Sequence, residues 1–269
     1  MNKNVRNSAI FSMHTISLGA LLLAACFGIS SVARADEADA RRLLKAMSDY
    51  LAAQQAYSFA YDATLEVVSK EDQVLGLASS GTVVVNRPDK IHATRKGGFA
   101  DVDMSFDGST LTILGKNLNL YTQIATPGTI DQLVDVLRNQ YGLHLPAADL
   151  MLSNAYDALM ANVVDVKDLG SGVIGGTECD SLAFRTAEVD WQIWIAQGDR
   201  PYPCRYVISS KLIAGGPQYS IQISDWKTGG TATKDDFTFK NATNAKKVEF
   251  KDLKGAGDLP DNFTQGESQ

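Results

Sequence analysis

The sequence predicts a mainly β protein built on one large, curved antiparallel sheet, an open half-barrel with helices on its concave side. Three observations lead to this fold class. Apolar and polar residues alternate over many short segments, which is the pattern of antiparallel strands with one buried face. One helical segment precedes these strands and a second interrupts them. Open sheets of more than about ten strands tend to curl, so we expect the helices in the hollow of the sheet.

The first 35 residues have the pattern of an export signal. Lys3 and Arg6 form a positive start, and residues 16–29 are apolar but too short for a stable membrane span. Cleavage after Ala35 fits the small-residue rule and predicts a periplasmic protein. A lipobox that ends at Cys26 leaves a second processing route open, which would give a lipid-anchored envelope protein.

The mature chain is acidic and undivided. Loss of residues 1–35 removes three of the 25 basic residues and none of the 31 acidic ones, so the net charge changes from −6 to −9. Such a charge argues against a nucleic-acid partner. Residues 36–250 show no linker or repeat, and we expect one domain there, followed by a polar C-terminal tail at 251–269. We expect a monomer.

The elements follow in order along the chain. Leucine and methionine residues at helical spacing predict a helix over 37–55. Thr129 is a candidate N-cap for the second helical segment, 129–160. Alternating residues predict strands near 57–67, 74–86, 90–96, 101–107, 110–115 and 118–123 before that segment, and near 163–169, 178–186, 189–196, 204–213 and 219–226 after it.

The candidate sites for chemistry are few. Cys179 and Cys204 remain after signal removal, and an even pair in an exported protein predicts a disulfide bond. Neither cysteine has a CxxC partner, so we expect no metal site and no cofactor. Residues 170–175 match a dinucleotide-binding glycine pattern, but no helical period follows it, and we interpret it as a hairpin turn. Asp101 and Asp103 share one face of a strand and are interpreted as solvated surface rather than a catalytic pair.

Several motifs together resemble a known superfamily. They are the order helix then long strand, Gly81-x-Val-x-Val-x-Arg-Pro-x-Lys-Ile91, Asp107-Gly-Ser-Thr-Leu111, Leu120-Tyr121 and Asp236-Phe-Thr-Phe239. This order resembles the lipoprotein carriers and their relatives, the superfamily of LolA, LolB and LppX. Residues 179–185, 190–195 and 198–201 look closer still to an uncharacterised group of predicted periplasmic proteins, a domain of unknown function within that superfamily.

The resemblance implies a function without enzymatic chemistry. It implies that Arg87, in the Arg-Pro motif, latches a lid made by residues 129–160 over an apolar cavity. The expected partner is an apolar ligand, an acyl chain, lipid or acylated polypeptide, with an envelope protein as a further candidate. The alternative is a structural protein or envelope-stress sensor whose cavity is filled by its own side chains. We expect the ligand to contact Tyr57, Phe59, Tyr61, Val83, Met104, Leu120, Trp191 and Ile193.

Overall fold

The fold is described from a computed structural model of the chain. The structure describes residues 37–98, 100–142, 147–232, 237–253 and 263–264. The predicted export signal, with its alternative lipidation site at Cys26, lies outside these residues. Within them, no helix is long and apolar enough to cross a membrane.

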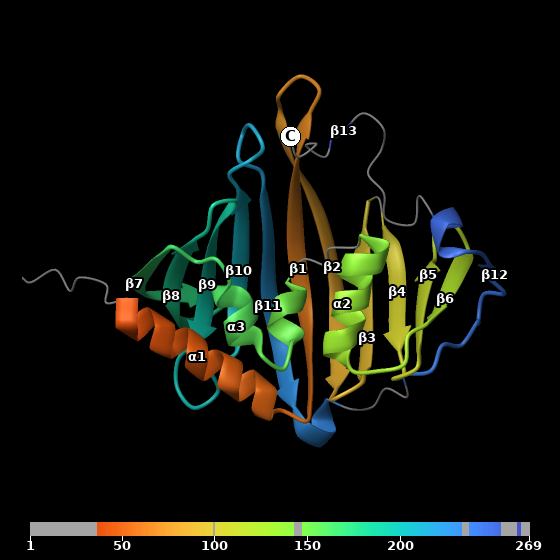
Figure 1. The fold of residues 1–269 in the computed structure, drawn as a ribbon, viewed down its shortest axis with the longest axis horizontal. Helices are drawn as coiled ribbons and strands as arrows, with labels where there is room; N and C mark the ends of the chain where they lie inside the picture. Colours follow the sequence, from red (N-terminus) through yellow and green to blue (C-terminus); the bar gives the residue numbers. More distant parts are fainter. Residues whose placement is uncertain (1–36, 99, 143–146, 233–236, 254–262, 265–269) are drawn as a thin grey trace, which may run out of the picture. The chain divides into compact units, whose positions relative to one another are not determined.

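One large sheet dominates the described part of the chain (Figure 1). Its strand order is β12-β6-β5-β4-β3-β2-β1-β11-β10-β9-β8-β7, and it does not close on itself. The strands are β1 (Ala56–Ser69), β2 (Val74–Asn86), β3 (Lys90–Gly97), β4 (Asp101–Phe106), β5 (Thr110–Gly115), β6 (Leu120–Ala125), β7 (Asp165–Ile174), β8 (Thr177–Arg185), β9 (Val189–Ala196), β10 (Pro203–Ser210), β11 (Gln218–Thr228), β12 (Lys246–Lys247) and β13 (Phe263–Thr264).

The two halves of the sheet meet at β1. This strand pairs with β2 on one side and with β11 on the other, so the first strand of the chain lies in the middle of the sheet. Strands β2 to β6 continue one half as a meander, and β11 to β7 continue the other half in reverse order. The predicted mainly β, open half-barrel is therefore the fold of this chain.

Two details of the sheet differ from the expectation. The pairing of β12 with β6 is parallel, which makes the sheet mixed, because the chain after β11 returns to the far edge beside Leu120 and Tyr121. Residues 170–174 continue β7, and the turn of the hairpin is formed by Gly175 and Gly176, both with positive φ. The glycine pattern is thus part strand and part turn.

The helices cover one face of the sheet (Figure 1). They are α1 (Glu37–Ala53), α2 (Ile130–Tyr141), the 3-10 turn η1 (Ala148–Met151) and α3 (Ala155–Met160). Thr129 caps α2 as predicted, since its hydroxyl accepts from the amide of Gln132 while the Gln132 side chain accepts from the amide of Thr129. Further 3-10 turns, η2 (Gly229–Thr231) and η3 (Phe250–Asp252), follow β11 and β12.

Each half of the sheet has its own hydrophobic core beneath a different helix. The core under α1 contains Leu44, Met47 and the inner side chains of β8 to β11. The core under α2 contains Ile130, Leu133 and the inner side chains of β2 to β5. Phe59, Tyr61 and Trp226 pack against both cores, so the two halves join at β1 and β11.

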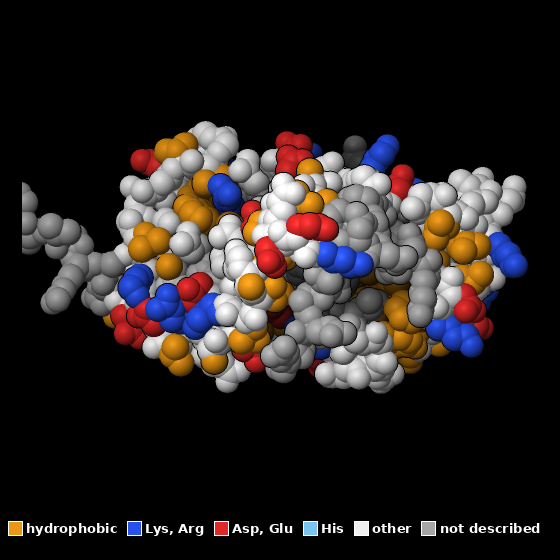
Figure 2. Space-filling view, turned by 90° about the horizontal axis from the view of Figure 1, so that it is seen from above, with side chains coloured by type: hydrophobic (Ala, Val, Ile, Leu, Met, Phe, Trp, Pro, Cys, Tyr) orange, Lys and Arg blue, Asp and Glu red, His pale blue; other side chains and the backbone are white. Residues whose placement is uncertain are grey.

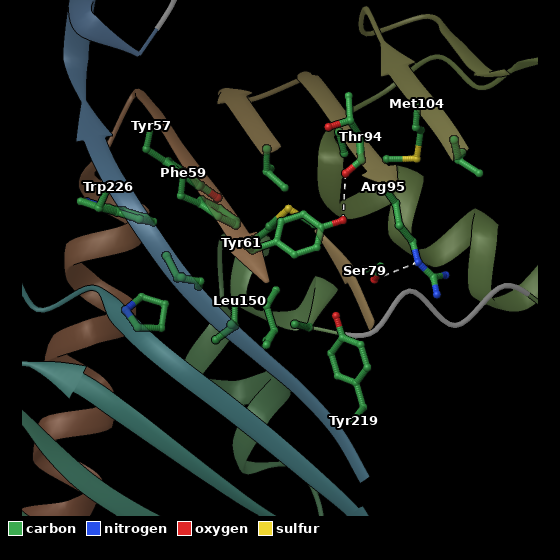
Figure 3. Close-up of a pocket in the computed structure, with 18 of the residues that line it drawn as sticks. Tyr57, Phe59, Tyr61, Ser79, Thr94, Arg95, Met104, Leu150, Tyr219 and Trp226 are labelled. Atoms are coloured by element: carbon green, nitrogen blue, oxygen red, sulfur yellow. Dashed lines mark hydrogen bonds between the residues drawn. The ribbon is translucent and has the colours of Figure 1, made fainter. Parts of the chain in front are cut away.

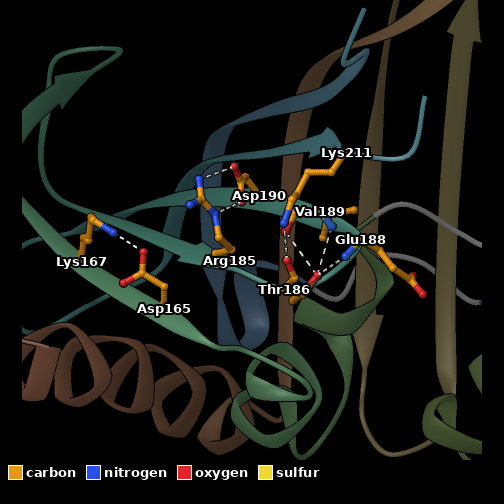
Figure 4. Close-up of polar contacts among 8 residues, drawn as sticks. All are labelled: Asp165, Lys167, Arg185, Thr186, Glu188, Val189, Asp190 and Lys211. Atoms are coloured by element: carbon orange, nitrogen blue, oxygen red, sulfur yellow. Dashed lines mark hydrogen bonds and ion pairs between the residues drawn. The ribbon is translucent and has the colours of Figure 1, made fainter. Parts of the chain in front are cut away.

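Charged side chains gather on the outer surface of the α1 half. Figure 2 shows residues of both signs over α1, where ion pairs such as Arg41 with Glu37 and Arg42 with Asp39 follow helical spacing. The hairpin of β8 and β9 is tied by a bidentate pair between Arg185 and Asp190, at 2.7 and 2.9 Å (Figure 4). These pairs are exposed and contribute little individually to stability.

Candidate ligand-binding cavity

A cavity of about 270 Å³ lies where the two halves of the sheet meet (Figure 3). Its walls come from the inner faces of β1 to β4, β10 and β11, from Leu51 of α1, and from the segment 147–151. Most of the side chains in these walls are apolar, as in ordinary binding sites for small organic molecules. The wall residues are Leu51, Tyr57, Phe59, Tyr61, Leu65, Ser79, Val83, Ala93, Thr94, Arg95, Val102, Met104, Ala147, Leu150, Met151, Pro203, Tyr219, Ile221, Ile223 and Trp226.

One end of the cavity is an aromatic floor. The ring of Trp226 stacks on Tyr57 and Phe59, with centroids 5.2 and 5.7 Å apart, and on Tyr202 at 5.3 Å. The indole of Trp226 donates to the hydroxyl oxygen of Tyr50 over 3.2 Å. Leu51 and Tyr57 beside this stack are each 1% exposed. Phe59 and Trp226 are partly exposed, so only the Tyr57 side of the floor is fully buried.

A β-bulge places Trp226 in this floor. Ile221 and Ile223 line the cavity, so simple alternation along β11 would turn residue 225 inward and Trp226 outward. Between the pairs Ser58 with Lys227 and Ala60 with Ser224, however, two residues of β11 face one residue of β1. Asp225 takes a positive φ of 52°, as the extra residue of a bulge often does. The bulge reverses the alternation and turns the indole inward.

Tyr61 forms part of the wall because residue 81 has no side chain. Its hydroxyl donates to the carbonyl oxygen of Thr94 over 2.8 Å, across β2 (Figure 3). A Cβ at Gly81 would lie 1.9 Å from that carbonyl oxygen and 2.8 Å from the Tyr61 hydroxyl. Glycine is thus required at position 81 for this crossing.

The other end of the cavity is polar. Arg95, Ser79 and Tyr219 gather there, and all three are partly exposed (Figure 3). The Nε of Arg95 donates to the Ser79 hydroxyl over 3.4 Å. Burial and, to a smaller extent, the neighbouring Tyr61 raise the pKa of Tyr219 to about 12, while the positive charge of Arg95 opposes the rise. Both tyrosines are therefore protonated donors at neutral pH.

The eight residues expected to contact a ligand lie in three places: in the cavity walls, at the far edge of the sheet and in the core under α1. Five of them line the cavity: Tyr57, Phe59, Tyr61, Val83 and Met104. The other three do not, although alternation puts them on the same inner face of the sheet.

The reasons differ for these three residues. Leu120 pairs with Gly115, and Gly115 pairs with Val102 at the cavity wall, so Leu120 lies two strands beyond the cavity. Trp191 and Ile193 are 3% and 0% exposed in the core under α1, and Trp191 stacks on Phe184 at 3.9 Å. Helix α1 fills that half of the sheet.

Arg87 lies at the turn between β2 and β3, beside the aromatic floor. Its guanidinium carbon is 5.7 Å from the centroid of the Tyr57 ring. Among the described residues, its Nε and Nη2 and the Tyr57 hydroxyl are buried without a hydrogen-bond partner. Burial raises the pKa of Tyr57 to about 12, although the charge of Arg87 opposes the rise.

Backbone contacts connect the Arg87-Pro88 turn to the helices. The Arg87 amide donates to the Gln55 carbonyl over 2.8 Å, which ties the turn to the loop after α1. The Ile130 amide, at the start of α2, donates to the Pro88 carbonyl over 2.9 Å. The turn therefore touches the helical segment 129–160 through a backbone bond.

Two further contacts hold that segment. The Asp131 carboxylate accepts from the amide of Ser153 over 3.0 Å and also from its hydroxyl. The Tyr156 amide donates to the Ser48 hydroxyl of α1 over 2.9 Å. Segment 129–160 is thus fastened at its start, at its middle and against α1.

Cys179 and Cys204 lie in contact but unbonded in this structure. Their sulfur atoms are 2.8 Å apart, and they are 0% and 2% exposed. Burial raises the pKa of both thiols, which disfavours the reactive thiolate at neutral pH. Among the described residues, no three His, Cys, Asp or Glu side chains converge on a point that could hold a metal ion.

Several solved structures are similar to this one. Lipoprotein LppX of Mycobacterium tuberculosis is 14% identical, with a TM-score of 0.47 over 76% of this chain and 100% of that chain. A chain of the MucA/MucB complex of Pseudomonas aeruginosa is 13% identical, with a TM-score of 0.43 over 75% of this chain and 61% of that one. A LolA superfamily protein of Nitrosomonas europaea is 10% identical, with a TM-score of 0.34 over 74% and 99%. At these TM-scores the similarities do not bear on what the protein binds.

The sequence itself identifies the family. No curated protein matches it closely enough to be counted as a relative. The model of the DUF2092 family, described as predicted periplasmic proteins, matches residues 40–251. This match covers most of the chain and confirms both the resemblance to a periplasmic group of unknown function and the expected location. The chain belongs to the DUF2092 family of periplasmic proteins.

Proposed function

We propose that this protein is a non-enzymatic periplasmic carrier or sensor that binds the hydrocarbon chain of a lipid or acylated molecule. The observation that carries the proposal is the cavity of about 270 Å³ between the sheet and residues 147–151, with its aromatic floor and apolar walls. Transfer of hydrocarbon from water into such a site is worth roughly 0.8 kcal/mol per CH₂, or about 8 kcal/mol for ten carbons. Apolar contact is therefore sufficient for binding.

Release is the harder step, and segment 129–160 is the element we propose to control it. Ala147, Leu150 and Met151 of this segment form part of the cavity wall. The described contacts that fasten it are a few hydrogen bonds, each worth about 0.5–1.5 kcal/mol, and the burial of side chains such as Ile130, Leu133 and Leu137 in the core under α2. A membrane surface or a partner protein could offset this fastening if it accepts the apolar face of the segment. We propose that the segment is a lid and that Arg87 steadies the turn that holds it.

Lipid extraction tests this proposal directly. Protein purified from the periplasm is denatured, extracted with organic solvent and analysed by mass spectrometry. We expect a co-purifying acyl chain from the wild type. The Ala93→Phe variant, which fills the cavity from β3, should lose it. Ala183→Phe is the matched control, since Ala183 lies outside the cavity walls between the buried residues Leu182 and Phe184. Equal amounts of lipid from all three proteins would contradict the assignment of the cavity.

One observation favours a second candidate function. The half of the sheet under α1 is filled by side chains of the protein itself, among them Trp191, Ile193 and Met47. If the second half is also closed in the cell, the protein acts through its surface, as a structural or stress-sensing partner of another envelope protein. An extract without lipid, together with no binding of added fatty acid, would support this alternative.

A further inference from the structure

The cavity has opposite chemical character at its two ends. Trp226, Phe59 and Tyr57 form the aromatic floor, whereas Arg95, Ser79 and Tyr219 form the polar, partly exposed end (Figure 3). A ligand that is apolar along its whole length would need no cation at the cavity wall. An amphiphile would match both ends, with its chain on the floor and its head group near solvent.

Arg95 has free capacity for such a head group. Its described hydrogen bond uses Nε alone and is long, at 3.4 Å to Ser79. A guanidinium has five N–H donors arranged to grip a carboxylate or phosphate, which leaves its terminal nitrogens available. The Arg95 charge acts on the hydroxyls of both Tyr61 and Tyr219, so the three groups lie near one another.

The size of the cavity limits the number of chains. A volume of about 270 Å³ lies near the lower end of ordinary ligand sites, which span about 300–1,000 Å³. It suits one acyl chain better than the several chains of a triacylated polypeptide. Resting on the proposed function, we infer that the ligand is a single-chain anionic amphiphile, held head-outward by Arg95 and Tyr219 with its chain on the Trp226 floor.

Calorimetric titration of the lipid-stripped protein tests this inference. The probes share a ten-carbon chain and differ in the head group: decanoate, decyl phosphate and 1-decanol. At low ionic strength we expect both anions to bind the wild type at least about tenfold more tightly than the alcohol, a difference of about 1.4 kcal/mol. Acetate and inorganic phosphate carry the anion without the chain, and we expect neither to bind at the same concentrations.

Matched variants locate the head group. Arg95→Gln should remove the preference for the anions while keeping the binding of 1-decanol. Tyr219→Phe should reduce the preference and keep the ring. Lys96→Gln is the control, because it removes the same charge from the next residue of β3, which points to the other face and does not line the cavity. Melting curves confirm that each variant is folded.

The outcomes separate this inference from the function on which it rests. Equal affinity for decanoate and 1-decanol would overturn the inference that the ligand is anionic. The proposal that the protein carries an apolar ligand would still stand. Loss of the preference in Arg87→Gln, but not in Arg95→Gln, would place the head group at the other end and overturn the orientation. Tight binding of acetate or phosphate alone would make the site an anion site without a chain. If no ten-carbon probe binds, the proposed function itself fails.

Discussion

Single residues on the outer face of the sheet carry charge interactions that depend on pH. The Asp103 carboxylate accepts from His92 Nε2 over 2.8 Å and pairs with Lys116 Nζ at 2.9 Å. Burial raises the pKa of Asp103, but the hydrogen bonds and charges of His92 and Lys116 outweigh it and lower the pKa below 3.8. The sequence interpretation of a solvated acid overlooked these partners, which come from β3 and from the turn after β5.

The sign of this shift gives a prediction. The folded protein holds the Asp103 proton less tightly than the unfolded chain does, so the pair stabilises the fold above about pH 4 and the stabilisation is lost as pH falls through the lowered pKa. We expect Asp103→Asn to cost less than about 1 kcal/mol at pH 7, since the pair is partly exposed, and to cost less still at pH 3.

Urea unfolding at the two pH values measures this cost. Asp101→Asn is the matched control, because Asp101 lies on the same face of β4 and its carboxylate has no partner among the described residues. A cost for Asp103→Asn that is unchanged between pH 7 and pH 3 would show that the interaction is not ionic.

Among the secondary-structure elements, the proposed lid, segment 129–160, is the one whose fastening can be tested. We expect Arg87→Leu to keep the fold but to release a bound fluorescent fatty acid about fivefold faster, the factor that corresponds to about 1 kcal/mol. The reason is that Arg87 packs on Tyr57 in the turn whose Pro88 carbonyl holds the start of α2. Stopped-flow displacement of a dansyl-labelled fatty acid measures the rate.

Two companion variants make the lid experiment specific. Thr129→Ala removes the cap of α2 at a cost of about 0.5–2 kcal/mol and should also speed release. Lys90→Leu removes a cation near the same turn and should leave the rate unchanged. If Arg87→Leu alters the melting temperature but leaves the release rate unchanged, Arg87 acts only as a strand-end residue. The proposal that it latches the segment 129–160 is then wrong.

The elements also show how far the sequence could be interpreted. Period-two alternation located β1 to β11 because one face of each strand is buried, and Thr129 marked the start of α2 because its cap is local chemistry. Alternation assigns a face but gives no position across the sheet, so Leu120 was placed in a cavity that ends two strands earlier.

Two further differences between the expected and the observed cavity walls have other physical causes. Trp191 and Ile193 face inward as the alternation predicts. Helix α1 packs against them, however, and the period of a strand cannot predict which helix covers it. Trp226 was missed as a cavity residue because the bulge at Asp225 shifts the alternation by one residue. The aspartate before this tryptophan is a weak signal for the bulge, since Asp tolerates positive φ better than most residues.

At the scale of the whole molecule, the two cysteines link distant parts of one sheet half. Cys179 of β8 and Cys204 of β10 meet beside Ala196, the last residue of β9. In the oxidising periplasm we predict that they form a disulfide bond. A closed loop of this length, 25 residues from one cysteine to the other, should stabilise the fold by about 3 kcal/mol.

Thiol titration decides the bonding state. Protein purified from the periplasm and unfolded without reductant should show no free thiol from this pair, and reductant should lower its urea midpoint. The double variant Cys179→Ser, Cys204→Ser should have the lowered midpoint with or without reductant. Two titratable thiols in the unreduced wild type would refute the bond.

The central position of β1 also determines the order in which this sheet can be assembled. A chain that is delivered with its N-terminus first can add β2 to β6 onto one edge of β1 at once. The opposite edge receives β11, whose residues pair with β1 from Thr228 opposite Tyr57 to Tyr219 opposite Leu65, and β11 is nearly the last strand to arrive. Until then the future middle of the sheet is an open edge, with unpaired amides and carbonyls that attract other chains. The same seam where the cavity forms is therefore among the last to close, and the floor of the cavity exists only once almost the whole chain has been delivered.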